Sequence, residues 1–308
     1  MHQTTNDMGK FSITIPTYRA QDLREAIESV VSQTYPDWEL IIVDDCSPEN
    51  LRAVVEPFLA DSRISYFRNE RNCGVVNVVD NWNICLSHCT GDYVICMGDD
   101  DRLHPCCLEE YLKLIAQYPD LNVYHARTRI IDETGRTVET LKECPPYETC
   151  QQMLYAQWSE RRKQFIGDFL FSRKWLTDNR GYVSFPLAYS SDWATANLAA
   201  KDKGIANGKN FMFEYRNHRD TISRSQNLRL TFAACDQVFH WYEQVYAGQL
   251  PDVFKPFFTR QMKNFVFLDV RNRPLSEMSY WLAYSQKVFI PKYEIVKACL
   301  KGMAAKVI

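Results

Sequence analysis

Three aspartates, Asp99, Asp100 and Asp101, stand side by side directly after the largely apolar run from Tyr93 to Met97. Carboxylates this close repel one another and raise one another's pKa unless a positive charge lies among them. The run therefore indicates a cation site, a group that takes up protons, or a loop in solvent. Which of these applies depends on the other polar groups that the fold brings to the same place.

Three other predicted strands are also followed by polar residues or turn residues. These are Pro16, Thr17 and Tyr18 at the end of the first strand, Asp44 and Asp45 at the end of the second, and Asn72, Gly74 and Asn77 after the third. In open parallel sheets ligands bind outside the carboxyl ends of the strands, so the four groups together predict one crevice. Taken singly, each is also compatible with an ordinary turn or helix start.

Strand and helix patterns alternate through the first 131 residues. Strands are predicted at 11–18, 38–45, 64–69, 92–97 and 122–131, and helices at 22–33, 47–59, 75–88 and 104–118, with Ser47 as an N-cap and a hairpin turn at 132–136. This alternation predicts an α/β fold with a largely parallel sheet. From about 140 the pattern is mixed, and from about 227 it is mostly helical and aromatic, which predicts a helical C-terminal appendage.

Two common phosphate-binding motifs are missing. The first predicted strand is not followed by G-x-G-x-x-G, and G-x-x-x-x-G-K-[ST] does not occur, so a dinucleotide-binding domain is disfavoured and a P-loop is excluded. A divalent cation held by carboxylates is the obvious substitute, because Mg²⁺ and Mn²⁺ accept oxygen ligands and keep positions open for substrate phosphates.

The C-terminal segment differs in charge from the rest of the chain. From Val253 onward ten Lys or Arg face three acids, a charge of +7, whereas the remainder carries −9 within the total of −2. A basic segment with interleaved aromatics suits an anionic membrane surface. A helical subdomain with buried aromatics and solvated lysines fits the pattern equally well.

Targeting signals and cysteine use point to the cytoplasm. The sequence contains no apolar run of membrane-spanning length and no apolar secretory segment in "MHQTTNDMGK", so we expect a cytoplasmic protein, possibly at the inner face of the cell membrane. The eleven cysteines form no C-x-x-C pair, which indicates reduced thiols. We expect no nucleic acid partner.

Five separated motifs resemble, in order, those of family 2 inverting glycosyltransferases with the GT-A fold. They lie in "ITIPTYRAQDLREAIESVVSQTYPDWELIIVDDCSPEN", "NERNCGVVNVVDNWNICLSHCTGDYVICMGDDD", "SSDWATANLAAKDKGI" and "FEYRNHRDTIS". The resemblance covers roughly residues 10–225. It implies a Rossmann-like, mostly parallel sheet flanked by helices in a domain at 1–225, with a nucleotide-sugar-binding half at about 10–132, an acceptor and catalytic part at about 140–225, and an appendage at 226–308.

The resemblance also implies a role for each matching residue. The donor nucleotide would be bound by Pro16, Thr17, Tyr18, Asp44, Asp45, Asn72, Gly74, Asn77 and Asp99, and the metal by Asp100 with Asp99 and Asp101. The family's D-x-D-D becomes Gly98-Asp99-Asp100-Asp101 in this chain, so Gly98 replaces the first acid. Asp192 matches the general base, and a plain helix cap at this position is the less favoured alternative. Asp168, Arg216 and His218 would lie near the sugar, the acceptor or the diphosphate.

These residues imply a metal-dependent inverting enzyme. It would use Mn²⁺ or Mg²⁺ to transfer a sugar from a nucleotide diphosphate donor, with a UDP-sugar favoured. The acceptor would be a hydroxyl of a glycan or lipid-linked oligosaccharide, as in bacterial capsule or O-antigen assembly. One alternative is a sugar nucleotidyltransferase, but such enzymes have a first loop rich in glycine and arginine, and the segment "IPTYRAQD" of this chain does not. The other is a nucleotide-sugar-binding protein without turnover, which the change at Gly98 suggests. A metal-independent reaction remains open if the carboxylates hold no ion.

Overall fold

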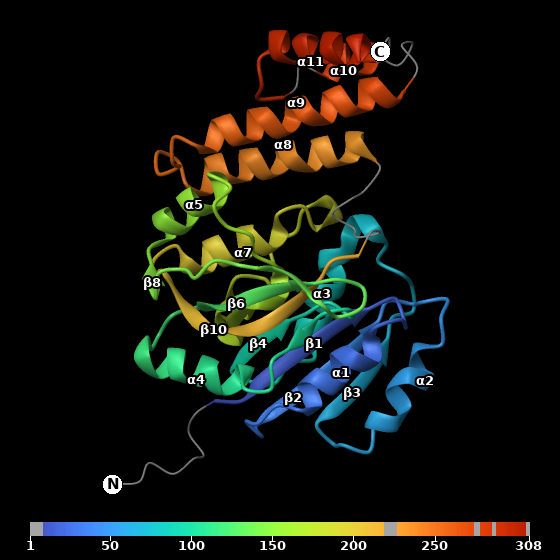
Figure 1. Ribbon diagram of the computed structural model, residues 1–308, viewed down its shortest axis with the longest axis vertical. Coiled ribbons are helices and arrows are strands. Elements are labelled where there is room, and N and C mark those ends of the chain that lie inside the picture. The colour runs from blue at the N-terminus through green and yellow to red at the C-terminus, as the bar shows by residue number, and fades with distance from the viewer. Residues whose placement is uncertain (1–8, 219–226, 274–277, 285–287, 306–308) are drawn as a thin grey trace.

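The computed structural model describes residues 9–218, 227–273, 278–284 and 288–305. Its sheet has the order β3-β2-β1-β4-β9-β6-β10-β5, with β7 beside β6 and β8 beside β10 (Figure 1). The strands are β1 Phe11–Thr17, β2 Trp38–Asp44, β3 Ile64–Arg68, β4 Tyr93–Cys96, β5 Arg102–Leu103, β6 Val123–Ile131, β7 Thr137–Thr140, β8 Tyr147–Glu148, β9 Phe169–Ser172 and β10 Ile205–Arg216.

Helices cover both faces of this sheet. The α-helices are α1 Leu23–Val31, α2 Leu51–Val55, α3 Val78–Ser87, α4 Cys107–Gln117, α5 Cys150–Trp158, α6 Arg173–Asp178, α7 Ser191–Ala200, α8 Leu228–Val245, α9 Phe254–Asn272, α10 Met278–Tyr284 and α11 Lys292–Ala304. Short 3₁₀ turns are η1 Glu56–Phe58, η2 Val75–Asn77, η3 Ile166–Asp168 and η4 Pro186–Ala188.

The α/β class expected from the alternating pattern is confirmed. Strands β3, β2, β1 and β4 are mutually parallel. Strand β9 pairs antiparallel with both β4 and β6, and β10 is parallel to β6, so β6 and β10 run in the same direction as β1. Because β2 and β4 flank β1 on opposite sides, the chain order switches at β1 and leaves a crevice at the carboxyl ends of β1 and β4. The hairpin expected at 132–136 is also present, joining β6 to β7.

The start of the second helix differs from the prediction. Helix α2 begins at Leu51 with Asn50 as its N-cap, whose side chain accepts a hydrogen bond from Ala53 N. Ser47 instead donates its hydroxyl to Tyr18 O at 2.7 Å, while its backbone N–H is bound by Asp44. The hydroxyl therefore joins the turns that follow β1 and β2, and the N-cap lies three residues later than expected.

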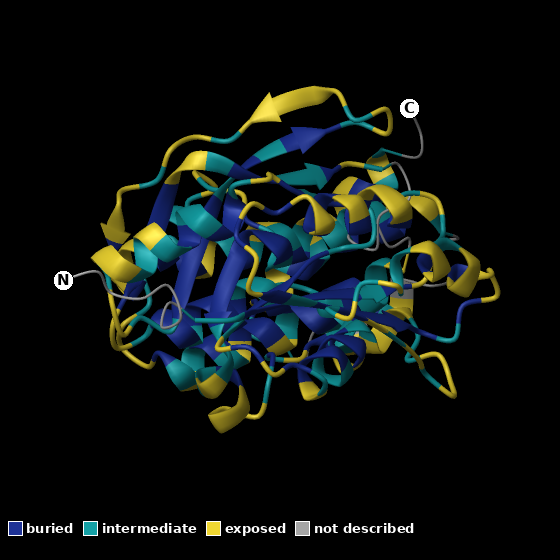
Figure 2. Ribbon diagram, turned by 90° about the horizontal axis from the view of Figure 1, so that it is seen from below, coloured by how far each residue is buried: buried dark blue, intermediate teal, exposed yellow. Residues whose placement is uncertain are grey.

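Apolar residues of each strand divide between the two faces of the sheet. On β2, Ile41 and Val43 belong to the cluster that contains residues of α3, α7 and α8, whereas Leu40 and Ile42 belong to the cluster with α1 and α4. This alternation follows from the two-residue period of a strand. Figure 2 shows the buried strands enclosed by helices and loops that carry the exposed residues.

The C-terminal helices are packed by their aromatic residues. Figure 1 shows α8 to α11 stacked at one end of the molecule. Phe254, Phe258 and Trp281 are each at most 1% exposed, and the Trp158 ring of α5 lies 5.0 Å from that of Phe258. These aromatics therefore form core between α5 and the C-terminal helices and are not available to a membrane. The boundary expected at 225 stays a prediction. Among the residues described, no helix combines the length and apolarity needed to cross a bilayer.

Candidate active site

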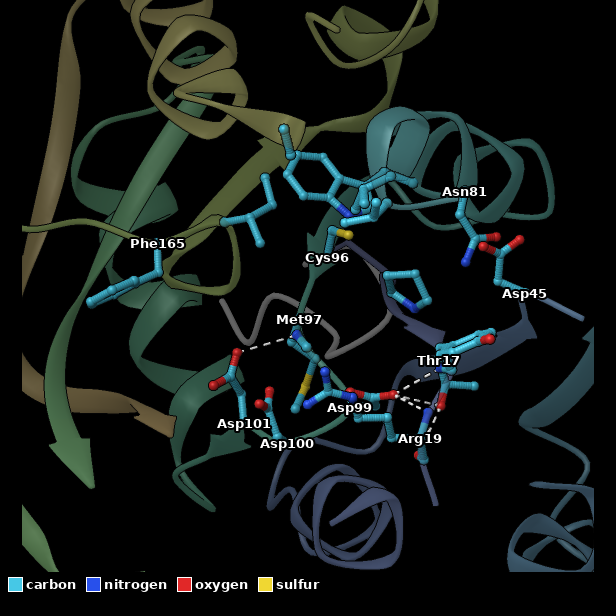
Figure 3. A pocket seen from close by; sticks show the side chains of 18 of the residues that line it. Thr17, Arg19, Asp45, Asn81, Cys96, Met97, Asp99, Asp100, Asp101 and Phe165 are labelled. Atoms are coloured by element: carbon cyan, nitrogen blue, oxygen red, sulfur yellow. Dashed lines mark hydrogen bonds between the residues drawn. The ribbon is translucent and has the colours of Figure 1, made fainter. Parts of the chain in front are cut away.

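A cavity of about 520 Å³ opens at the carboxyl ends of β1 and β4 (Figure 3). Most of the residues singled out in the sequence line it. They are Pro16, Thr17, Tyr18, Asp45, Asn72, Gly74, Gly98, Asp99, Asp100, Asp101, Asp192 and His218. The parallel strand ends thus bring together groups that are up to two hundred residues apart.

Asp99 joins the end of β4 to the turn after β1. Its Oδ2 accepts hydrogen bonds from Thr17 Oγ1 at 2.8 Å and from the backbone N–H groups of Tyr18 and Arg19 at 2.9 and 3.1 Å. Figure 3 shows these bonds converging on one oxygen. Three donors to one carboxylate oxygen hold the side chain in place, so Asp99 sets the shape of the turn as well as lining the cavity.

The carboxylate of Asp100 lies beside the imidazole of His218 at the cavity wall. His218 Nε2 lies 3.4 Å from Asp100 Oδ2 and 3.1 Å from Asp22 Oδ2. Burial and the adjacent Asp99 carboxylate raise the pKa of Asp100 to about 6, although His218 counteracts them. Asp22 occupies the N-cap position of α1 without capping it, and its carboxylate is directed at His218 instead. Asp22 is therefore a site residue that the sequence patterns did not reveal.

Asp101 is buried beneath the cavity, with 4% of its surface exposed. Its two oxygens accept backbone N–H bonds, Oδ1 from Arg216 at 3.0 Å and Oδ2 from Gly98 at 3.2 Å. Burial and the neighbouring Asp100 raise its pKa well above the usual range. Both oxygens therefore help to hold the turn, and the direct metal contact expected for Asp101 stays a prediction.

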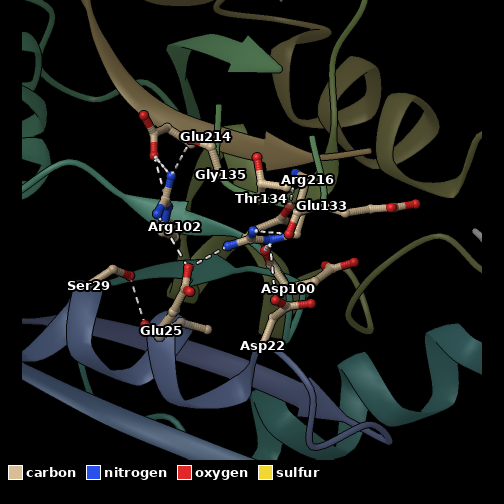
Figure 4. A network of polar contacts seen from close by, with 12 residues as sticks. Asp22, Glu25, Ser29, Asp100, Arg102, Glu133, Thr134, Gly135, Glu214 and Arg216 are labelled. Atoms are coloured by element: carbon tan, nitrogen blue, oxygen red, sulfur yellow. Dashed lines mark hydrogen bonds and ion pairs between the residues drawn. The ribbon is translucent and has the colours of Figure 1, made fainter. Parts of the chain in front are cut away.

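The sequence resemblance placed Arg216 near the diphosphate, but in the structure its side chain is buried. Its side chain is 1% exposed, and its guanidinium donates to Asp100 O at 2.8 Å, to Glu133 O at 3.3 Å and to Glu25 Oε2 at 2.6 Å. Figure 4 shows this network bridging α1, β10 and the turn after β4. The guanidinium thus binds three protein oxygens and does not line the cavity, so it holds these segments together.

The part of the cavity at which the sequence predicts the nucleotide is formed by Asp45 and the loop before η2. Asp45 Oδ1 accepts from Asn69 Nδ2 at 2.8 Å and from Cys73 N at 2.9 Å, and Asn72 Nδ2 donates to Asp45 O at 2.6 Å. Gly74 has φ of 79°, a left-handed conformation that glycine adopts without strain. The loop is thereby fastened to the end of β2.

Two residues predicted for the same part of the cavity lie elsewhere. Asp44 is fully buried. Its carboxylate accepts from Ser47 N and from Tyr66 Oη at 2.6 Å, and it pairs with Arg68. Asn77 is exposed and donates to Cys73 O at 3.2 Å. Neither side chain lines the cavity. Asn81, one helical turn beyond Asn77, lines the cavity where Asn77 was expected.

Asp168 is also set back from the cavity. It is fully buried, and its Oδ2 accepts from Thr128 Oγ1 at 2.9 Å and from Phe165 N at 3.1 Å. His125 Nε2 lies 3.6 Å from the same oxygen. Burial alone would lower the pKa of His125, but the Asp168 carboxylate raises it to about 9. The η3 turn directs this acid inward, so Asp168 is not among the residues that line the cavity, and its contact with sugar or acceptor stays a prediction.

Asp192 is in the first turn of α7, whose N-cap is Ser190. Its Oδ1 accepts from Trp193 N at 2.8 Å, and burial raises the pKa of the carboxyl to about 7. Leu187, Ala188 and Ser190 all have positive φ, an unfavourable conformation for residues with a Cβ. Strain of this kind clusters at functional sites, and here it precedes the acid best suited to act as a base near neutral pH.

The metal site expected from the sequence is present only in part. Among the described residues, no three His, Cys, Asp or Glu side chains converge as a set of metal ligands. Asp100 and His218 supply two adjacent ligand atoms at the cavity wall. A pair of protein ligands fits a cation that takes its remaining ligands from substrate phosphates and water.

Comparison with known proteins agrees with this geometry. Residues 12–183, more than half of the chain, match the family model described as glycosyl transferase family 2. The chain belongs to glycosyltransferase family 2. The GT-A likeness expected from the motifs is borne out by a solved structure of S. aureus TarS 1–349 in complex with UDP-GlcNAc. The superposition covers 96% of this chain and 89% of the TarS chain, with a TM-score of 0.66. At 17% identity the match shows the fold alone.

Two curated relatives each match about a third of this glycosyltransferase. The putative colanic acid biosynthesis glycosyl transferase WcaA of Escherichia coli is 42% identical over 104 residues, 33% of this chain and 36% of that protein. The GalNAc(5)-diNAcBac-PP-undecaprenol beta-1,3-glucosyltransferase of Campylobacter jejuni is 37% identical over 98 residues, 31% of each chain. The chain spans about half, or less, of the length of the curated relatives it matches.

Sequence reasoning missed several residues that complete the glycosyltransferase cavity. They include Arg19, Asn81, Trp82, Phe165, Leu187, Ala188 and Tyr215. Asn81 might have been found from its place on the helix face, four residues beyond Asn77. The apolar ones carried no chemical signal, because an aromatic or aliphatic side chain has the same pattern in a core and at a cavity wall.

Gly98 is required by the carboxylates around it. A Cβ at this position would lie 2.7 Å from Asp100 Oδ1 and 2.9 Å from Asp101 Oδ2, both closer than Cβ contacts allow. We expect Gly98→Ala and Gly98→Asp each to lower kcat/KM for nucleotide-sugar turnover by about tenfold or more, because the carboxylates must shift. Gly248→Asn, at a glycine with no neighbour within 4 Å, is the control. Restored or improved turnover in Gly98→Asp would contradict this explanation.

Proposed function

We propose that the protein is a metal-dependent inverting glycosyltransferase that transfers a sugar from a nucleoside diphosphate donor to a glycan hydroxyl. One observation carries the proposal: Asp45, Asp100, His218 and Asp192 all line a single cavity, with Asp100 next to His218. Binding a nucleotide, holding a cation beside a diphosphate and activating a hydroxyl need groups of these kinds.

A uridine diphosphate sugar is the donor that we favour. The related fold of TarS was solved with UDP-GlcNAc, and residues of two loops, those at Tyr18 and Asn72, line the cavity near Asp45. Asp45 is the carboxylate there, held by Asn69 and Cys73 N. Its oxygens would accept hydrogen bonds from the N–H groups of the base.

Asp100 and His218 are the residues that would hold the divalent ion. When it is bound, Mg²⁺ or Mn²⁺ supplies positive charge beside the diphosphate as that group leaves. Asp22 Oδ2 lies 3.1 Å from the same His218 Nε2, and binding of the ion would replace this contact. Asp99, fastened to the β1 turn, keeps Asp100 at the edge of the cavity where a diphosphate would lie.

Asp192 is the proposed general base. A hydroxyl oxygen of the acceptor would attack the anomeric carbon while the bond from that carbon to the diphosphate oxygen breaks on the opposite face. The hydroxyl proton passes to the Asp192 carboxylate, and the configuration at the anomeric carbon inverts in this one displacement. A pKa of about 7 places the base near the pH at which it must gain and lose protons.

The acceptor that we favour is a lipid-linked glycan of bacterial surface polysaccharide assembly. Support comes from the relatives named for colanic acid biosynthesis and for an undecaprenol-linked substrate. The outermost helix α11 also exposes Lys292, Tyr293, Lys297, Leu300 and Lys301. Its acid Glu294 is paired with Lys263, so the exposed face is basic and partly apolar. Such a face suits an anionic leaflet on the cytoplasmic side of a membrane.

Asp192→Asn should lower kcat by about 10²- to 10⁴-fold while UDP binding persists, because the amide cannot accept the proton. In the wild type the base works only when ionised, so kcat should rise with pH through about 7 and then level off. Steady-state transfer rates and calorimetry measure the two effects. Asp178→Asn, on the exposed surface of α6, is the control, and full activity in Asp192→Asn would contradict the mechanism.

Asp100→Asn should weaken Mn²⁺ binding by about tenfold or more in the presence of UDP, because one charged ligand is lost. The free Mn²⁺ signal in electron paramagnetic resonance measures this without turnover. Asp252→Asn, an exposed acid outside the cavity, should bind as the wild type does. Undiminished wild-type transfer in excess chelator would refute metal dependence.

Lys297→Glu with Lys301→Glu should abolish sedimentation with vesicles of phosphatidylglycerol and phosphatidylcholine, since each basic residue near an anionic surface contributes about 1 kcal/mol. Pure phosphatidylcholine should bind little wild-type protein. The pair Lys142→Glu and Lys209→Glu, also exposed but outside α11, should sediment normally. Equal sedimentation of both double variants would rule out α11 as the contact.

A further inference from the structure

Two aromatic rings of the cavity wall are stacked on each other. The centroids of Phe165 and Tyr215 are 3.7 Å apart and their planes are inclined by only 8°. Both side chains line the cavity and are half-buried. Phe165 precedes η3 and Tyr215 is near the end of β10, so distant segments form the pair. Parallel rings cover one face of each other and leave the outer faces for another flat, apolar group.

The pair lies on the side of the cavity that carries the proposed base. Gln164 O, next to Phe165, accepts a hydrogen bond from Trp193 Nε1 at 3.3 Å, and Trp193 directly follows Asp192. Figure 3 shows Phe165 across the cavity from Asp45 and Asn81. The rings are therefore remote from the nucleotide end and attached to the start of α7.

The other end of the pair is anchored to the carboxylate turn. Tyr215 directly precedes Arg216, whose backbone N–H is bound to Asp101. The rings thus stand between the turn that faces the diphosphate and the helix that carries Asp192. An acceptor must reach the anomeric carbon from the side opposite the leaving group, so its sugar has to pass along this wall.

Ile166 directly follows Phe165 and also lines the cavity, so it adds an apolar side chain beside the rings. A pyranose ring has C–H groups gathered on one face and hydroxyls around its edge. Those C–H groups are attracted to the electron-rich face of an aromatic ring, and the edge hydroxyls stay available for polar partners. A sugar ring therefore fits this wall better than a phosphate or a nucleobase edge would.

We propose that Phe165 and Tyr215 form a stacking platform for the pyranose ring of the acceptor. The platform holds the ring by its C–H face so that an edge hydroxyl meets Asp192. It selects acceptors whose terminal sugar has an uninterrupted C–H face, as β-gluco- and β-galactopyranosides do. This inference rests on the proposed function, since Asp192 defines the acceptor side.

The test uses methyl β-D-glucopyranoside and methyl β-D-galactopyranoside as probes, with UDP and Mg²⁺ present. Saturation-transfer NMR should show transfer from the wild-type protein to the axial ring protons. Phe165→Leu keeps apolar volume but removes the aromatic face, and it should weaken binding roughly three- to tenfold. Phe165→Tyr should bind like the wild type. Phe67→Ala is the matched control, because Phe67 is stacked on His88 with centroids 3.8 Å apart outside the cavity.

Calorimetry of UDP binding separates this inference from the proposed function. Unchanged UDP affinity in Phe165→Leu, with weaker glycoside binding, supports the platform. Three results overturn it: no transfer to ring protons in a wild-type protein that binds UDP, equal glycoside binding in Phe165→Leu, or a parallel loss of UDP affinity that assigns the rings to the donor. Failure of the wild type to bind UDP would instead refute the proposed function.

Discussion

The site depends on how the protein accommodates three adjacent carboxylates in a mostly buried turn. Each carboxylate meets a different set of partners, and the sets come from different elements. Asp99 takes donors from the turn after β1, Asp101 takes backbone N–H groups of Gly98 and Arg216, and Asp100 faces His218. The three carboxylates therefore lie in three different environments, and Asp100 is the one that faces an imidazole at the cavity wall.

Arg216 makes this arrangement part of the fold. Its buried guanidinium binds Glu25 of α1, the carbonyl of Glu133 in the β6–β7 hairpin, and the carbonyl of Asp100. A buried charge is tolerated only when it is paired and hydrogen-bonded. The same contacts that satisfy the arginine therefore fix the distance between α1, the hairpin and the carboxylate turn. Asp22, just before α1, is held where its carboxylate meets His218. Tyr215 directly precedes Arg216 and stacks on Phe165.

Much of the framework was predictable because it depends on local periodicity. The alternation of strands and helices through 131, the parallel sheet and the crevice at the strand ends follow from patterns of two and 3.6 residues. Individual carboxylates were harder to assign. Asp44 and Asp45 are adjacent after one strand, yet Asp44 is buried against Tyr66 and Arg68 while Asp45 lines the cavity. Side chains alternate along a strand, and which face meets the cavity depends on residues far away in the sequence.

The sequence by itself determined the class of fold, the strand ends at which a ligand binds, the family, and the acids available for chemistry. Only the tertiary structure decided which polar groups bind other protein groups and which line the cavity. Asp101, Asp168 and Arg216 are directed inward by partners on other elements, whereas Asp22 and the Phe165–Tyr215 pair are brought to the cavity from segments without a recognisable motif. The reason is that burial and hydrogen bonding between distant segments set the direction of a polar side chain, and no local pattern encodes them.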